Sequence, residues 1–138
     1  MKQDKTLDAT GKLEFAYDLK YDILTFHIKD RDYKMSVEVQ NFVIDIDTED
    51  FVTGVRVIDA SKVFSLDKTV LKGIVQGQFK AVIRDNVITV RLGFIGKMRN
   101  KLIGIDKQDF TQQVTVPLGE KKHVEDSEVY AEEIKVAH

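Results

Sequence analysis

Residues 79–92 read FKAVIRDNVITVRL, and this stretch decides the fold class. On both sides of Asp85-Asn86, apolar residues recur at every second position, the period of a β-strand with one buried face. Asp and Asn both tolerate positive φ angles, so this pair suits a two-residue hairpin turn. The stretch therefore predicts an antiparallel β-hairpin in which Lys80 lies directly opposite Arg91 on the polar face.

The same alternation recurs along much of the chain and predicts further antiparallel strands. A first hairpin is expected over residues 13–28, with a polar tip at residues 18–22. Other candidate strands follow at residues 35–39, 42–46, 51–57, 102–105 and 110–116. The pattern predicts a mostly β fold of antiparallel sheets.

Residues 59–73 interrupt the strands and predict one or two short helices. Asp59 and Ser61 are residue types that cap a helix N-terminus, because their side chains accept a bond from a free backbone N–H. Gly73 is a natural C-terminal stop for the apolar pattern that follows them.

Two segments of the chain resemble each other. Residues 43–57 and 102–116, which lie 59 positions apart, are identical at seven of fifteen positions. The two hairpins also align, at an offset of 64 positions. Shared alternation alone would explain the matched valines and isoleucines, but not the matched Asp and Phe residues of the turn.

This similarity predicts a single domain over residues 1–138 with two tandem β-rich repeat units. The first unit spans residues 12–73 and the shorter second unit spans residues 78–118. Two such units would pack their apolar sheet faces together around one core, with the short helices after the first unit. Residues 119–138, with six acids and three lysines, are expected to form a marginal helix or a disordered acidic tail.

Composition narrows the classes of protein further. The chain has 138 residues, no cysteine, and a formal net charge of −2 from 21 basic and 23 acidic residues. The lack of cysteine removes disulfides, thiolate nucleophiles and cysteine-based metal sites. No run of residues reaches the roughly 18 apolar residues that cross a membrane, and residues 1–6 lead into no signal peptide. We expect a cytoplasmic protein with no membrane partner.

The first half also contains a set of motifs. Tyr17-Asp18 followed by Asp22-Ile23-Leu24 fits the pattern Y-D-x-x-x-D-x-L. Residues 45–47 fit an acidic strand end, and residues 54–61, GVRVIDAS, fit a closing G-I-x-I-x-D-A-S. Together these motifs resemble the microbial family called domain of unknown function 2283, over residues 13–64. The resemblance implies a fold and no chemistry.

The acidic residues offer two candidate sites. Asp45, Asp47, Glu49 and Asp50 would form either a solvated hairpin tip, which we favour, or a weak cation site. They do not match an EF-hand loop, which needs Gly at its sixth position and Glu at its twelfth. Asp18 and Asp22 are expected to bond to nearby backbone N–H groups at their turn, and not to act as an acid–base pair.

Other catalytic patterns fail on spacing. Residues 65–68 fit S-x-x-K but lack the companion motifs of a serine acylase. Ser61 and Lys62 would be adjacent on a helix and so face apart. Three scattered histidines, His27 among them, make no metal site, and no glycine loop cradles a phosphate. We therefore expect no catalytic residues, no metal and no cofactor.

One basic stretch stands out beside the turn of the second hairpin. Residues 80–101 contain six basic residues and only one acidic residue, Asp85. The basic residues are Lys80, Arg84, Arg91, Lys97, Arg99 and Lys101. Like charges directly opposite destabilise a hairpin, so a partner should offset them. Acids such as Asp45, Asp47 or those of the tail are the favoured partners, and a bound polyanion is the alternative. No aromatics interleave on this face, so base stacking is not expected.

These observations favour a non-enzymatic interaction module that binds a protein partner or self-associates. The alternative is a nucleic-acid-binding protein that uses the basic hairpin to contact the phosphate backbone. We expect the salt-sensitive binding that would support this alternative to be absent.

Overall fold

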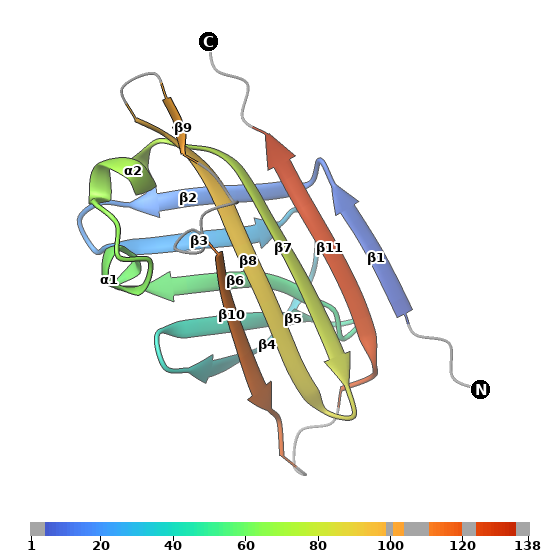
Figure 1. The fold of residues 1–138 in the computed structure, drawn as a ribbon. Helices are drawn as coiled ribbons and strands as arrows, with labels where there is room; N and C mark the ends of the chain where they lie inside the picture. The colour runs from blue at the N-terminus through green and yellow to red at the C-terminus, as the bar shows by residue number, and fades with distance from the viewer. Residues whose placement is uncertain (1–4, 99–100, 104–110, 120–123, 135–138) are drawn as a thin grey trace.

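The computed structural model describes residues 5–98, 101–103, 111–119 and 124–134. These residues form two β-sheets that lie face to face, with two short helices at one end (Figure 1). We call the sheet nearer the viewer in Figure 1 the front sheet and the other the rear sheet. The predicted mostly β fold of antiparallel sheets is confirmed.

The rear sheet contains only strands from the first half of the chain, in the order β2-β3-β6-β5-β4, and every pair is antiparallel. The predicted first hairpin and the three strands after it are confirmed. The strand bounds are β2 (Leu13–Asp18), β3 (Ile23–Ile28), β4 (Tyr33–Val39), β5 (Phe42–Asp47) and β6 (Val52–Ile58).

The front sheet has the order β1-β11-β7-β8-β10, with β9 also paired to β8. The pairing of β1 with β11 is parallel, and the other pairs are antiparallel. Its strands cross those of the rear sheet in Figure 1. The bounds are β1 (Lys5–Thr10), β7 (Ile74–Arg84), β8 (Val87–Met98), β9 (Lys101–Ile103), β10 (Thr111–Pro117) and β11 (Ser127–Ile134).

The β7–β8 hairpin forms in the predicted register. Asp85 and Asn86 occupy the turn with φ angles of 49° and 64°. Lys80 lies directly opposite Arg91, as expected. Both side chains are exposed, so the polar face of the hairpin is the outer face of the front sheet.

The acidic tail is a strand, and the prediction of a marginal helix or disorder is wrong for Ser127–Ile134. This segment, β11, lies between β1 and β7. Val129 and Ala131 are buried in the core, while Glu128 and Tyr130 lie on the outer face. The two-residue period is present in the sequence, but the small buried side chains and the surrounding acids conceal it.

The two predicted helices are α1 (Ala60–Val63) and α2 (Lys68–Lys72), and Gly73 is the C-cap residue of α2 as expected. They close one end of the sandwich, where the rings of Phe64 and Phe94 meet edge to face with centroids 4.9 Å apart. Asp59 holds the N-cap position of α1, but its side chain makes no capping bond.

The similar segments 43–57 and 102–116 predict equivalent hairpins if they are repeats, and this prediction is wrong for the described strands. In the first segment, β5 pairs with β6. In the second segment, β9 and β10 both pair antiparallel with β8, and therefore run in the same direction. The residues that join β9 to β10, 104–110, lie outside the described residues.

The two sheets meet over a pair of aromatic rings in the rear sheet. Phe15 and Phe26 are buried with ring centroids 6.3 Å apart. A Cβ atom added to Gly77 of β7 would lie 2.8 Å from the Phe26 ring and 3.0 Å from the Phe15 ring. Gly77 thus lets the front sheet approach the rings closely, because any larger residue would overlap them.

Replacement of Gly77 by Ala tests this contact. We expect Gly77→Ala to lower the free energy of unfolding by about 1–3 kcal/mol, because the added methyl overpacks the core. The lower backbone entropy of Ala in the unfolded state would offset only part of this loss. Urea unfolding measures the change, and Gln76→Ala in the same strand should stay within about 0.5 kcal/mol of the wild type. Equal stability of the two variants would contradict the close approach at Gly77.

Candidate functional site

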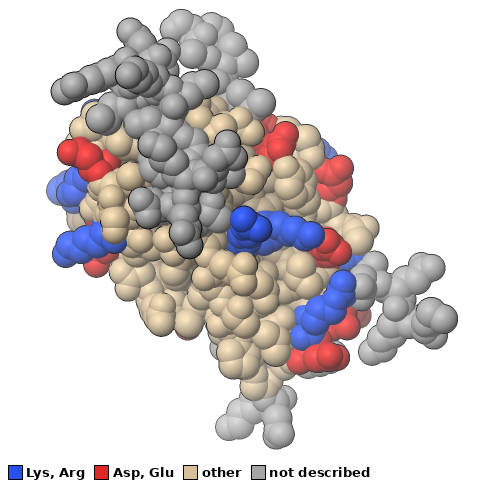
Figure 2. Space-filling view, in the orientation of Figure 1, with Lys and Arg blue, Asp and Glu red and all other residues tan. Residues whose placement is uncertain are grey.

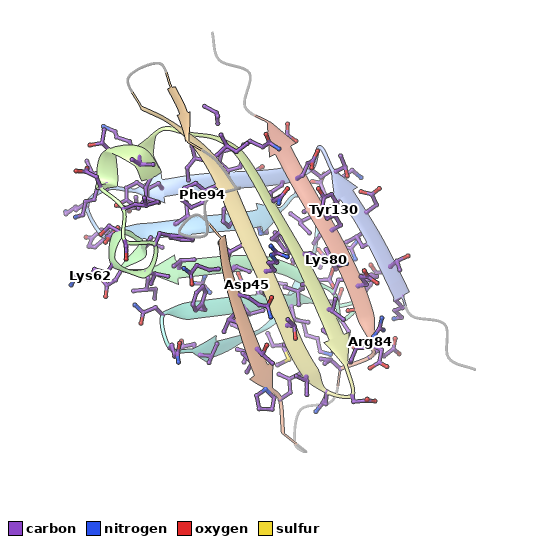
Figure 3. The ribbon with its side chains drawn as sticks, viewed as in Figure 1. Asp45, Lys62, Lys80, Arg84, Phe94 and Tyr130 are labelled. Atoms are coloured by element: carbon purple, nitrogen blue, oxygen red, sulfur yellow. The ribbon has the colours of Figure 1, made fainter. Side chains whose placement is uncertain are left out.

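Four polar side chains form a row across the outer face of the front sheet. Tyr130 of β11 lies opposite Lys80 of β7, Lys80 lies opposite Arg91 of β8, and Arg91 lies opposite Gln113 of β10. Figure 3 labels Lys80 and Tyr130 in this row, with Arg84 further along β7. The row arises because residues that pair across neighbouring strands project from the same face of a sheet.

The centre of the row is a hollow of about 230 Å³. Gly93 in β8 lies opposite Gln78. The hollow is lined by Gln78, Phe79, Lys80, Arg91, Leu92, Gly93 and Tyr130. It therefore combines two cations, an amide and an aromatic ring.

The acid Glu128 of β11 offsets part of this charge. Its carboxylate lies 3.2 Å from Nζ of Lys80 and 4.0 Å from a guanidinium nitrogen of Arg84. The expectation that tail acids pair with the basic hairpin is confirmed for these two residues. Arg91 makes no ion pair with any described residue.

The two acids of the first unit that were also expected to offset the hairpin have other partners. Asp45 pairs with Arg56 at 3.1 Å, and Asp47 pairs with Arg31 at 2.7 Å, all within the rear sheet and its turns. Neither therefore contributes to the outer face of the front sheet.

The structure thus brings together three of the six predicted polyanion-binding residues. Lys80, Arg84 and Arg91 share the outer face of the front sheet, where Figure 2 shows basic side chains beside acidic ones in a mostly uncharged surface. Arg99 lies outside the described residues, as do the side chains of Lys97 and Lys101. Their role in polyanion binding remains a prediction.

Tyr130 is the member of the site that sequence reasoning missed, and the expectation of a face without aromatics is wrong. Its side chain is 38% exposed beside Lys80. Its hydroxyl donates a 2.5 Å hydrogen bond to Glu132, which raises the pKa of the Tyr130 hydroxyl. The alternation of Ser127, Val129 and Ala131 with polar residues could have revealed this strand.

A second cluster joins the motif residues of the first half. The Asp22 carboxylate is 7% exposed and accepts bonds from the Tyr17 hydroxyl at 2.5 Å and from the Ser61 hydroxyl at 2.6 Å. It also accepts the backbone N–H of Ser61 at 3.0 Å, in the first turn of α1. The expectation that Asp22 bonds to backbone N–H groups of its own turn is wrong, because its partners are Tyr17 and the distant Ser61.

The geometry of this cluster suits structural support. Burial would raise the pKa of the Asp22 carboxyl, but the bonds from Ser61 and Tyr17 outweigh burial and lower it. Burial and the Asp22 carboxylate raise the pKa of the Tyr17 hydroxyl. An acid with a lowered pKa is a weak general base, so it activates the Ser61 hydroxyl poorly.

The surroundings of Asp22 agree with a structural role. The nearby open hollow of about 610 Å³ is lined by Tyr17 and Asp18, and not by Asp22 or Ser61. Asp18 accepts the backbone N–H of Tyr21, as expected for an acid at a turn. His27 is exposed on β3, opposite Gly54.

The acidic turn after β5 is not a solvated tip. Asp47 is 1% exposed, and one carboxylate oxygen accepts the backbone N–H groups of Glu49 and Phe51, each at 2.9 Å. Asp50 pairs with Lys34 and accepts the backbone N–H of Glu125. Sequence reasoning missed Lys34 and Glu125 because they lie 16 and 75 positions from Asp50 along the chain.

The described residues contain neither a candidate metal site nor a helix that could cross a membrane. Among residues 5–98, 101–103, 111–119 and 124–134, no group of three or more His, Asp or Glu residues could hold a metal ion. In the same ranges, no helix has the length and apolar character needed to cross a membrane.

Comparisons with known proteins give two weakly similar relatives. A Methanosarcina mazei protein named "Putative hypoxanthine phosphoribosyltransferase" is 25% identical over 95 residues, which cover 67% of this chain and 77% of that protein. An uncharacterized protein of Methanocaldococcus jannaschii is 27% identical over 93 residues, which cover 67% of this chain and 80% of that protein. No protein-family model matches the chain. No solved structure matches it.

Replacement of Asp22 by Asn tests the second cluster. We expect Asp22→Asn to lower the free energy of unfolding by about 1–3 kcal/mol, because the amide cannot accept all three donors. Asp30→Asn is the matched control, since Asp30 is exposed and has a φ of 63°, close to the 57° of Asp22. Urea unfolding that gives the two variants the same stability would contradict the structural role.

The pH dependence of stability provides an independent test. The pKa values of Asp22 and Asp50 are lowered in the folded state. Their ionised forms therefore contribute fully to the free energy of unfolding above the ordinary pKa of 3.8, and this contribution is lost as pH falls through the lowered pKa values. We expect the free energy of unfolding to decrease steeply below pH 3.8. Urea unfolding as a function of pH should show a shallower decrease in Asp22→Asn and in Asp50→Asn. An unchanged decrease in both variants would contradict this assignment.

Proposed function

We propose that this protein is a non-enzymatic interaction module that binds an anionic partner on the outer face of its front sheet. The observation that carries the proposal is the pairing of Arg91 with Lys80 across a hollow whose described lining residues include no acid. A binding surface of this kind needs charge and shape, and no nucleophile.

The energetics of the hairpin support an anionic partner. Lys80 and Arg91 repel each other across the strands, and of these two cations Glu128 pairs with Lys80 alone. The side chains of Lys80 and Glu128 are 56% and 35% exposed, and a surface pair of this kind contributes only about 0–1 kcal/mol. An incoming anion can therefore replace Glu128 at Lys80 and bind Arg91 at the same time.

The name of the Methanosarcina mazei relative suggests phosphoribosyl transfer as another function, and we do not propose that reaction for this chain. Many phosphate sites use the N-terminus of a helix. The helices α1 and α2 have 4 and 5 residues and lie at the end of the sandwich, whereas the hollow lies on the outer face of the front sheet.

We also propose the internal duplication, and strand register supports it. The order β2-β3-β6 matches the order β7-β8-β10, and all these pairs are antiparallel. Leu24 lies opposite Val57, and the residues at the repeat offsets, Ile88 and Val116, also lie opposite each other. Membership of the domain of unknown function 2283 family and a cytoplasmic location remain parts of the proposal, the latter supported by the absence of cysteine.

Charge reversal at Arg91 tests the anion-binding face. We expect Arg91→Glu to weaken binding of labelled inorganic polyphosphate by about ten-fold or more at low ionic strength, because a cation becomes an anion at the hollow. The binding of the wild type should weaken as salt is added. Fluorescence anisotropy measures both effects.

Arg56→Glu is the control, because Arg56 carries the same charge on the rear sheet. It should bind polyphosphate like the wild type, and both variants should keep melting temperatures close to the wild-type value. Absence of salt-sensitive binding in the wild type, or equal losses in the two variants, would refute the proposal.

A further inference from the structure

We infer that the anion bound at this hollow is the phosphate of a nucleotide unit, whose base stacks on Tyr130. The unit is either a free nucleotide or one residue of a single-stranded nucleic acid, since both present the same phosphate and base. The inference rests on the proposed function, because it specifies the ligand of the same anion-binding face.

The spacing of the three side chains suits this ligand. Tyr130, Lys80 and Arg91 come from three adjacent strands, β11, β7 and β8, at directly paired positions. Neighbouring strands lie about 4.8 Å apart, so the aromatic and Arg91 are separated by about two strand spacings, with Lys80 between them. A phosphate held by the two cations therefore places the base attached to it toward Tyr130.

The ring of Tyr130 is held in position before a ligand arrives. Its hydroxyl bonds to Glu132, which follows two positions later on the same face of β11. The side chain remains 38% exposed and lines the hollow, so a base can reach the ring. Stacking on an aromatic residue is available to every base and needs no particular sequence.

The rest of the hollow has the chemistry of a base-binding surface. Gln78 supplies an amide with both a donor and an acceptor, which can bond to the edge of a base. Gly93 lines the hollow beside it. A base must be unstacked from its neighbours to lie on Tyr130, and this condition favours a single strand over a duplex.

Removal of the acid Glu128 should strengthen ligand binding, whereas charge reversal at Arg91 should weaken it. Its carboxylate holds Lys80 at 3.2 Å and therefore competes with the phosphate for that cation. Removal of the acidic charge in Glu128→Gln should strengthen binding, because Lys80 then has no anion to exchange. A surface without a phosphate site would show no such gain.

A ligand pair that differs only in the base provides the test. Adenosine 5′-monophosphate and ribose 5-phosphate carry the same phosphate and sugar, and isothermal titration calorimetry measures their affinities for the full chain. We expect the nucleotide to bind about ten-fold more tightly to the wild type, because only it can stack on Tyr130. Tyr130→Leu should abolish this difference, Tyr130→Phe should keep it, and Glu128→Gln should strengthen the binding of both ligands.

The outcomes separate this inference from the proposed function. Equal affinities for the two ligands in the wild type, with polyphosphate binding still lost in Arg91→Glu, would refute the nucleotide and leave the anion-binding face intact. Binding of polyphosphate unaffected by Arg91→Glu would refute both. A short single-stranded RNA that binds more tightly than the mononucleotide would identify a strand as the source of the unit, whereas equal binding would identify the free nucleotide.

Discussion

The close contact between Gly77 and the rings of Phe15 and Phe26 is the constraint on which the two-sheet arrangement depends. Each sheet has one apolar face, and neither face can stay in water at acceptable free energy. The backbone of β7 reaches the aromatic pair because Gly77 has no Cβ atom, and this approach closes the core between the sheets. Polar side chains such as Lys80 and Arg91 then lie on the outer face of the front sheet.

Buried carboxylates fix the turns around this core. Asp22 joins the tip of the first hairpin to the start of α1 through Ser61, and Asp47 holds its own turn through backbone N–H groups and Arg31. The motif residues of the family resemblance, Tyr17, Asp22 and Ser61, thus meet in one structural cluster. Their hydrogen bonds join the first hairpin to α1 and give these residues a structural role.

The strand β11 completes the candidate site. The strand β11 enters the front sheet beside β7 and brings Glu128 and Tyr130 next to the basic hairpin. Glu128 offsets the positive charge of Lys80, and Tyr130 adds an aromatic ring. The outer face of the hairpin therefore carries basic, acidic and aromatic side chains together. The parallel strand β1 covers the far side of β11 and makes it an interior strand of the sheet.

The sequence by itself determined the elements whose cause is local. Two-residue alternation and the Asp85-Asn86 turn were enough for most strands other than β1 and β11, for the hairpin register and for the position of Arg91 opposite Lys80. Tertiary structure decided what depends on distant residues: the burial of Asp47, the capping of α1 by Asp22, and the insertion of β11 beside β7. The physical reason is that an acidic segment becomes a strand only when a neighbouring strand satisfies its backbone and a core accepts Val129 and Ala131. The alternation of Ser127, Val129 and Ala131 with polar residues is present in the sequence, but it does not specify the neighbouring strand, and so Tyr130 joins the site only in the folded chain.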